Sequence, residues 1–343
     1  MAQKYAKDQP AGFTNFIERI AIVGIGGRIG SHIAEELVKT GKHKVTALVR
    51  GESNATVPKS IHAAAINYED ETSIVSALRG QQFLIITLAV TAPPDTQSKL
   101  LKAAAQAGVP YVMPNVYGGD ILNNSLQAEA MYDSRPKIAE IESLGLSWVV
   151  LVCGFWYEWS LALGPFWFGF DFANKKVTFF DDGKTPINVS TWPQCGRAVA
   201  GLLSLKELPE DENDKSPTVS GWRNKPLYIT SFKASQRDML DSIHRLTGSS
   251  DKDWEIEYEP SLDRYEHGKA EMQKGLRTGF AKAMYARVFY PNGDGDFESS
   301  RGLDNELVGL QKEEIDKITR GTLDMVESGW NPFAQGFPQT TRR

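Results

Sequence analysis

The sequence predicts an α/β protein: a Rossmann-type, doubly wound parallel sheet followed by a smaller α+β carboxyl-terminal substrate domain. Two observations support this fold class. Short apolar runs alternate with amphipathic helical patterns between residues 20 and 152, as in parallel sheets with right-handed crossovers. Beyond residue 153 the composition changes to a dense run of aromatic residues. We therefore expect a Rossmann domain over 1–153 and a substrate domain over 154–343, with parts of 185–235 returning to the Rossmann sheet.

The first predicted strand and helix enclose a cluster of glycines. Residues 20–23 form an apolar run typical of a strand buried on both faces, and apolar residues at helical spacing follow from Ile29 to Val38. A tight turn and a backbone that approaches a pyrophosphate both need residues without a Cβ, and the start of a helix offers free N–H groups to the phosphate. The turn therefore predicts a dinucleotide-binding site, formed by Gly24, Gly26, Gly27, Arg28, Ile29 and Gly30.

The residue after the second predicted strand, 45–49, indicates which dinucleotide binds. NAD-dependent enzymes usually carry an acidic residue about twenty positions beyond the last glycine, where it binds the ribose 2′-hydroxyl. Here that position is Arg50, whose guanidinium favours the 2′-phosphate of NADP(H). Arg28 and Lys59 either add positive charge to this site or are solvated surface cations, and Glu52 opposes the assignment.

The remaining elements of the first domain place further residues at the same edge of the sheet. Strands are expected at 61–66, 83–88, 111–113 and 148–152, separated by helices at 72–79, 96–107 and within 126–144. Ligands of such sheets bind at the carboxyl ends of the strands. The residues expected there are Asn67, Thr87, Leu88, Ala89, Val90, Pro114, Asn115, Tyr117, Gly154, Phe155 and Trp156.

The aromatic stretch 154–172 allows two interpretations. Rings this dense form either a core or an inter-subunit face, or else a pocket for a planar or polycyclic substrate. Glu158 lies among them and could hold a basic amine or a cation, although a salt bridge at the rim is the simpler expectation. Further on, strands are expected at 177–182 and 227–230, and helices at 192–205, 235–246 and 303–326, the last broken near Gly321.

Composition and charge narrow the class of protein. The formal charge of -5 argues against a nucleic-acid surface, which needs clustered Lys and Arg. Cys153 and Cys195 are far apart in the sequence, so we expect neither a disulfide framework nor a metal site. The amino-terminal residues lack the apolar segment of a signal peptide, and no apolar run reaches the roughly eighteen residues of a membrane span. We expect a cytoplasmic monomer or homodimer without a membrane partner.

The order of these motifs resembles the NmrA-like and isoflavone-reductase-like proteins, which are atypical short-chain dehydrogenases with a Rossmann domain and a smaller substrate domain. The resemblance covers about 18–250 and is greatest for a fungal branch found in natural-product pathways. It is carried by V-G-I-G-G-R-I-G, L-V-R, I-I-T-L-A-V, V-M-P-N-V-Y-G, G-L-S-W-V-V-L-V-C-G-F-W and N-K-P-L-Y-I-T-S-F-K-A-S-Q-R-D-M-L.

This resemblance implies an NADP(H) cleft in which 87–90 follow the ribose and diphosphate, while 114–117 and 154–156 flank the nicotinamide. It also implies a helix lysine as proton donor, but the matching position holds Ser134, and the nearest lysine is Lys137. Tyr132 and Lys137 are five residues apart, so the Tyr-x-x-x-Lys pair of ordinary short-chain enzymes is missing too. Lys137, Tyr117 and Tyr132 are therefore the candidate donors to a carbonyl oxygen.

Three functions follow from these expectations. The first is an NADP(H)-dependent reductase of a bulky aromatic or alkaloid-like metabolite, acting on a C=O, C=N or C=C bond. The second is a cyclase that binds the same cofactor, for example a Pictet–Spengler-type enzyme in which Glu158 holds the amine. The third is a non-catalytic redox sensor that binds NADP(H), which the missing lysine favours and the aromatic pocket opposes.

Overall fold

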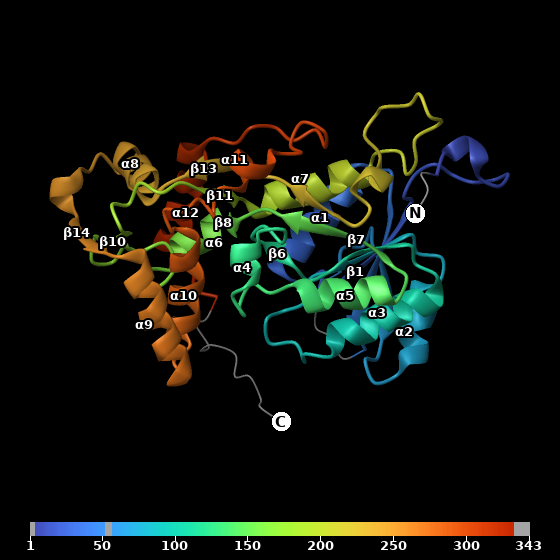
Figure 1. Cartoon of the computed structure of the whole chain (residues 1–343), viewed down its shortest axis with the longest axis horizontal. Helices are drawn as coiled ribbons and strands as arrows, with labels where there is room; N and C mark the ends of the chain where they lie inside the picture. The colour runs from blue at the N-terminus through green and yellow to red at the C-terminus, as the bar shows by residue number, and fades with distance from the viewer. Residues whose placement is uncertain (1–3, 52–56, 333–343) are drawn as a thin grey trace.

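A computed structural model of the chain describes residues 4–51 and 57–332. The molecule is elongated, with a large parallel sheet in one half and the helices and small sheets of the later chain in the other (Figure 1). The strands of the large sheet run in the order β3 (His62–Ile66), β2 (Lys44–Arg50), β1 (Arg19–Val23), β4 (Phe83–Ile86), β5 (Tyr111–Met113), β7 (Ser147–Val152) and β12 (Lys225–Tyr228), with β6 (Tyr117–Gly118) beside β7.

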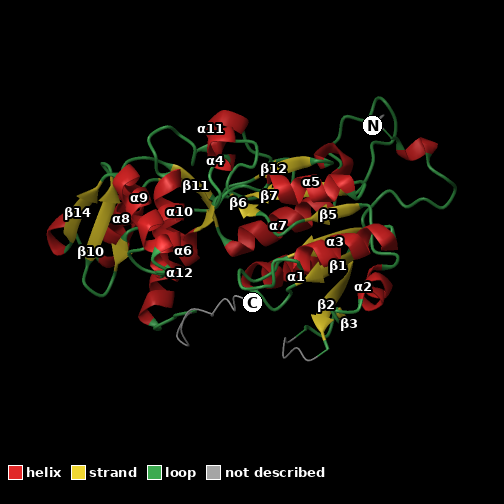
Figure 2. Ribbon diagram, turned by 60° about the horizontal axis from the view of Figure 1, so that its bottom comes forward, coloured by secondary structure: helices red, strands yellow, loops and turns green. Residues whose placement is uncertain are grey.

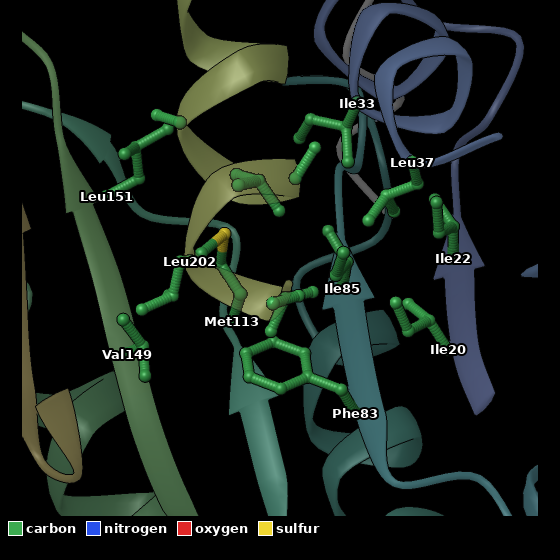
Figure 3. Close-up of a cluster of buried hydrophobic side chains, with 14 of the residues drawn as sticks. Ile20, Ile22, Ile33, Leu37, Phe83, Ile85, Met113, Val149, Leu151 and Leu202 are labelled. Carbon is green, nitrogen blue, oxygen red and sulfur yellow. The ribbon is translucent and has the colours of Figure 1, made fainter. Parts of the chain in front are cut away.

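Two layers of helices cover this sheet because its strands are apolar on both faces. In β1, Ile20 and Ile22 belong to one core cluster, whereas Ala21 and Val23 belong to the other, as the alternation of side chains along a strand requires. Figure 3 shows the first cluster, in which Ile33 of one helix and Leu202 of another pack against the sheet. Those helices are α1 (Arg28–Lys39) and α7 (Trp192–Leu203), and the opposite face carries α2 (Glu71–Leu78), α3 (Thr96–Ala107) and α5 (Arg135–Ser143).

The later chain forms a second body with its own core. One small sheet consists of β9 (Phe170–Asp171), β10 (Lys176–Phe180) and β14 (Glu255–Glu259), and another of β8 (Phe155–Trp156), β11 (Ile187–Ser190) and β13 (Phe232–Ala234). The helices around them, visible in Figure 2, are α6 (Tyr157–Ala162), α8 (Gln236–Thr247), α9 (Ser261–Gln273), α10 (Thr278–Val288) and α12 (Ile315–Glu327). The short helices α4 (Asn124–Gln127) and α11 (Phe297–Arg301) lie between the two bodies, and the 3₁₀ turns are η1 (Ala6–Asp8), η2 (Val219–Trp222) and η3 (Asp251–Asp253).

The predicted fold class is confirmed, and three details of the prediction can be compared with the structure. Strand β12 comes from the later chain, yet it pairs with β7 and so extends the first sheet. The helix expected at 126–144 is two helices, and Pro136 occupies the first turn of α5, where its missing N–H leaves no hydrogen bond unmade. The helix expected at 303–326 begins only at Ile315, and it continues unbroken through Gly321. Across residues 4–51 and 57–332, no helix is both long and apolar enough to cross a membrane.

Candidate functional site

The glycine corner after β1 is built by close contacts that exclude side chains. Gly24 has a φ of +83°, and a Cβ placed on it would lie 2.0 Å from the carbonyl oxygen of Thr87. A Cβ on Gly30 would lie 2.4 Å from the Gly24 oxygen and 2.6 Å from the Thr87 hydroxyl. Gly27 is the N-cap residue of α1 and has no side chain that could accept a hydrogen bond. The N–H groups of Arg28 and Ile29 therefore lack the partner that a capping side chain would supply. This helix start therefore suits an anion such as a diphosphate.

The turns after β4, β5 and β7 form one continuous edge beside this corner. The Thr87 hydroxyl donates to the Val23 carbonyl at 2.7 Å, which ties β4 to the end of β1. Asn115 accepts from the Leu88 N–H at 3.1 Å and donates back to the Leu88 carbonyl at 3.2 Å. Beyond them Ala89 and Val90 are exposed, Pro114 is buried, and the Gly154 N–H donates to the carbonyl of Gly118 at 3.0 Å. The structure thus places the residues predicted after β1, β4, β5 and β7 next to one another at one edge of the sheet.

The adenosine side of the predicted site lies at the ends of β2 and β3. Arg50 is the exposed last residue of β2 and pairs with Ile66 of β3. Asn67 follows β3, and its side-chain oxygen accepts from the Glu69 N–H at 3.0 Å. Lys59 is exposed in a turn next to a groove of about 740 Å³ between this turn and α1. Glu52, the residue opposing an NADP(H) assignment, lies outside the described residues.

Arg28 projects from the glycine corner toward the second body. Its guanidinium carbon is 4.4 Å from the ring centroid of Trp159 and 5.5 Å from that of Trp330, and burial lowers its pKa. Trp192 extends this aromatic cluster, with its ring centroid 6.3 Å from that of Trp159 and 6.4 Å from that of Trp330. A fourth tryptophan, Trp156, lies 6.5 Å from Trp192. Arg28 therefore contacts two members of a cluster of four tryptophans at the start of α1.

The aromatic stretch 154–172 divides into two parts. Tyr157, Phe168 and Phe170 are buried in the core of the second body, so the core interpretation holds for them. Phe155 stacks on Tyr285 with ring centroids 3.9 Å apart. Behind Gly154 and Phe155 there is a cavity of about 20 Å³, which is the size of one water molecule rather than of a polycyclic substrate. Trp159 lies against Arg28 of the glycine corner, and Trp156 packs on the core cluster that contains Ile25 and Ile29.

The candidate proton donors predicted from the sequence are placed less favourably. Lys137 is exposed on the first turn of α5, which removes the burial on which its role as a donor depends. Tyr117 donates to the Ile86 carbonyl at 3.0 Å, and Tyr132 donates to the Met284 carbonyl. Burial raises the pKa of both phenols well above the usual range. Each phenolic hydroxyl thus already donates its hydrogen bond to a backbone carbonyl oxygen.

Ser134, at the position of the family lysine, is locked into a local network. It is buried, and both its N–H and its hydroxyl donate to the side-chain oxygen of Gln127, at 2.9 and 2.7 Å. Gln127 in turn donates to the Tyr132 carbonyl at 3.0 Å. This arrangement leaves no group at position 134 that could act as an acid.

The structure contradicts the expectation that Glu158 forms a salt bridge at the rim of the site. It is only 8% exposed, and it appears in none of the ion pairs among the described residues. One carboxyl oxygen accepts from the backbone N–H of Trp192 at 2.9 Å, while the other is buried without a hydrogen-bond partner. Burial raises the pKa of Glu158 from 4.5 to about 7, and the nearby Glu313 adds to the rise.

Sequence reasoning missed the residues that surround Glu158. Ser190 and Trp192 lie more than thirty positions away, and only the parallel pairing of β11 with β8, which sets Ser190 opposite Trp156, brings them to it. Trp330 follows α12 and is much farther away in the sequence. No local spacing links these residues, so only the topology could have identified them. Within residues 4–51 and 57–332, no group of three or more His, Cys, Asp or Glu could hold a metal ion.

The strand order and the glycine corner at the switch between β1 and β4 define a Rossmann-type α/β protein. Comparison with known proteins narrows the class. Residues 17–161 match the model of the NmrA-like family, which confirms the resemblance found in the sequence.

Several known proteins are similar to this chain over most of its length. Oxidoreductase aprR of Aspergillus flavus is 26% identical over 312 residues, which span 89% of this chain and 98% of aprR. Among solved structures, an isoflavone reductase is 19% identical with a TM-score of 0.66, covering 89% of this chain and 99% of its own. AtPrR2 with NADP⁺ and (+)pinoresinol is 18% identical with a TM-score of 0.65, covering 90% of this chain and 100% of its own. At these identities the solved structures establish a shared fold.

Proposed function

We propose that this protein is an NADP(H)-dependent oxidoreductase that reduces a bulky aromatic small molecule. The observation that carries the proposal is the glycine corner, where Gly24 and Gly30 have no space for a Cβ and the start of α1 at Gly27 has no side-chain cap, at the switch point of the sheet. The name of aprR and the NADP⁺ bound to AtPrR2 support the same activity.

The chain's own residues divide the work of binding. The first N–H groups of α1 hold the diphosphate, and Arg50 pairs with the 2′-phosphate at the end of β2. Thr87 and Asn115 hold the turn after β4 in place, so that its backbone follows the ribose. The bound nicotinamide would supply a hydride to the substrate. The tryptophans beside Arg28 offer aromatic surface on which a planar substrate could stack.

A redox sensor is the second candidate, because Ser134 is locked to Gln127 and Lys137 is exposed. A reductase consumes NADPH only when substrate is added. A sensor consumes none, and it binds the oxidised and reduced cofactors with different affinities. A cyclase forms product with little net loss of NADPH. Absorbance of the nicotinamide together with product analysis therefore separates the three.

The cofactor assignment is tested with Arg50→Glu. Replacing the guanidinium by a carboxylate removes an ion pair with the 2′-phosphate and adds repulsion, so the Kd for NADPH should rise about 100-fold or more. The Kd for NADH, which lacks this phosphate, should change by only a few-fold. Calorimetric titration of both cofactors measures the two effects.

Arg79→Glu is the matched control, because Arg79 is also exposed but follows α2 at the far end of the sheet. It should leave both affinities unchanged. Equal losses of NADPH and NADH affinity in Arg50→Glu would contradict the 2′-phosphate assignment. Failure of the unchanged protein to bind NADPH would contradict the proposed function itself.

A further inference from the structure

We propose that Glu158, Ser190 and the indole N–H groups of Trp156 and Trp192 form a subsite for the oxygen of a ketone or quinone, and that Glu158 gives this oxygen its proton. The inference rests on the proposed function and adds to it the substrate class and the proton donor. The oxygen subsite is defined here by those four residues.

The first support is a concentration of buried polar atoms without partners. Among the described residues, the second carboxyl oxygen of Glu158, the Ser190 hydroxyl and the indole nitrogens of Trp156 and Trp192 are buried and make no hydrogen bond. Glu158, Ser190 and Trp192 are all at least nine-tenths buried. A buried polar group without a hydrogen bond destabilises the folded state, so four together need a ligand or ordered water.

These four groups belong to one place in the fold. The backbone N–H of Trp192 donates to Glu158 at 2.9 Å, Ser190 pairs with Trp156 across β11 and β8, and the indole rings of Trp156 and Trp192 are 6.5 Å apart. The oxygen subsite also adjoins the cofactor corner, because the Trp192 ring stacks on His32 of α1 at 6.3 Å. It thus lies past the carboxyl end of β7, where ligands of such sheets bind.

The chemistry of the unpaired atoms selects the ligand. The two indole nitrogens donate only, and the hydroxyl is free to donate, so three of the four groups fit an acceptor. A protonated amine or iminium presents no acceptor and would leave the two indoles unpaired. A carbonyl oxygen accepts from them, and the negative charge that grows on it during reduction strengthens each hydrogen bond. The oxygen subsite therefore fits C=O in preference to C=N.

Glu158 completes the reaction at that oxygen. As the carbonyl carbon gains a hydride, the electron pair of the C=O π bond moves to oxygen, and oxygen takes the carboxyl proton of Glu158. Glu158 is left as a carboxylate and regains its proton from solvent. Burial raises the pKa of Glu158 to about 7, which suits an acid at neutral pH.

The charged and titratable groups around Glu158 come from three elements. Glu313, before α12, faces it and is paired with Arg197 of α7 at 2.6 Å. Cys195 of α7 is also near, and burial raises its pKa. His32 and Arg28 of α1 lie against the rings of Trp192 and Trp159. None of the causes of the Glu158 shift is a positive charge, so the neutral acid is favoured.

The oxygen subsite is tested by infrared difference spectroscopy with acetophenone that carries ¹³C at its carbonyl, with and without NADP⁺. In the unchanged protein, the carbonyl band of the bound ketone should move to lower frequency. The shift should be lost in the double variant Ser190→Ala with Trp192→Phe, which keeps both positions filled. No shift, or a shift that survives in the double variant, overturns the subsite and leaves ordered water as its content. NADPH binding by calorimetry tests the proposed function separately.

The proton donor is tested by the NADPH-dependent reduction of 9,10-phenanthrenequinone. Glu158→Gln should lower kcat about 100-fold with little change in KM, and it should remove a fall in kcat that the unchanged enzyme shows above pH about 7. Glu207→Gln is the control, since burial also raises the pKa of that carboxyl, beside Tyr111 and Arg223. An unaltered pH profile in Glu158→Gln, or no reduction of the quinone by protein that binds NADPH, overturns the donor role.

Discussion

Glu158 couples protonation to folding, because its carboxyl group is buried without a counter-charge. The rise of its pKa from 4.5 to about 7 corresponds to about 3 kcal/mol, at about 1.4 kcal/mol for each unit of pKa. A folded-state pKa above the unfolded value means that the folded protein holds the proton more tightly. The resulting stability is fully present below pH 4.5 and is lost as the pH rises through about 7.

Glu158→Gln should therefore change the pH dependence of stability. Between pH 5 and pH 8, the unchanged protein should lose up to about 3 kcal/mol more unfolding free energy than the variant, which has no proton to release. Urea unfolding at both pH values measures the difference, and Glu306→Gln at an exposed position serves as control. A constant difference between the two proteins at both pH values would show that Glu158 is not buried as a neutral acid.

The same residue shows what sequence reasoning can reach at the scale of single residues. The composition around 154–172 singled out Glu158, but a lone carboxylate among rings carries no sign of its burial. Its surroundings come from β11 and α7, which are remote in sequence. Arg50, by contrast, was located from spacing alone, because its distance from Gly30 follows from the lengths of α1 and β2.

At the scale of elements, the βαβ unit and the parallel sheet were predictable because apolar runs and glycine turns are local signals. The α9–α10 hairpin was not predicted, since residues 251–290 are mixed and charged. Its helices pack closely through glycines: a Cβ on Gly268 would lie 2.6 Å from the Ala283 nitrogen and 2.8 Å from the Gly279 oxygen. Both neighbours are backbone atoms, which cannot turn aside as a side chain would.

Gly268→Ala should consequently separate α9 from α10 and lower the unfolding free energy by about 1–3 kcal/mol. Gly321→Ala is the matched control, because Gly321 lies inside α12 with no atom within 4 Å of an added Cβ. That variant should gain up to about 1 kcal/mol from the higher helix propensity of alanine. Urea unfolding measures both, and a stability gain in Gly268→Ala would contradict the close packing.

At the scale of the whole molecule, the large sheet must end without offering a free edge to another chain. Its last strand, β12, belongs to the later chain and carries Pro226, which has no N–H to donate. The segment at Asp304 covers the rest of the edge. The Asp304 side chain accepts from the Tyr228 N–H at 2.8 Å and from the Trp222 indole at 3.2 Å, and its own N–H donates to the Tyr228 carbonyl at 2.7 Å.

Asp304→Ala should uncover this edge. Two buried donors would lose an ionised acceptor, which costs about 3 kcal/mol of unfolding free energy, and the exposed strand would become a template for pairing between molecules. Guanidinium unfolding measures the first effect, and light scattering at increasing protein concentration measures the second. Asp304→Asn keeps one side-chain oxygen as an acceptor and should show a smaller loss without self-association. If Asp304→Ala loses stability but stays monomeric, the shielding of the edge depends on Pro226 and the backbone contact of residue 304, because these remain in the variant.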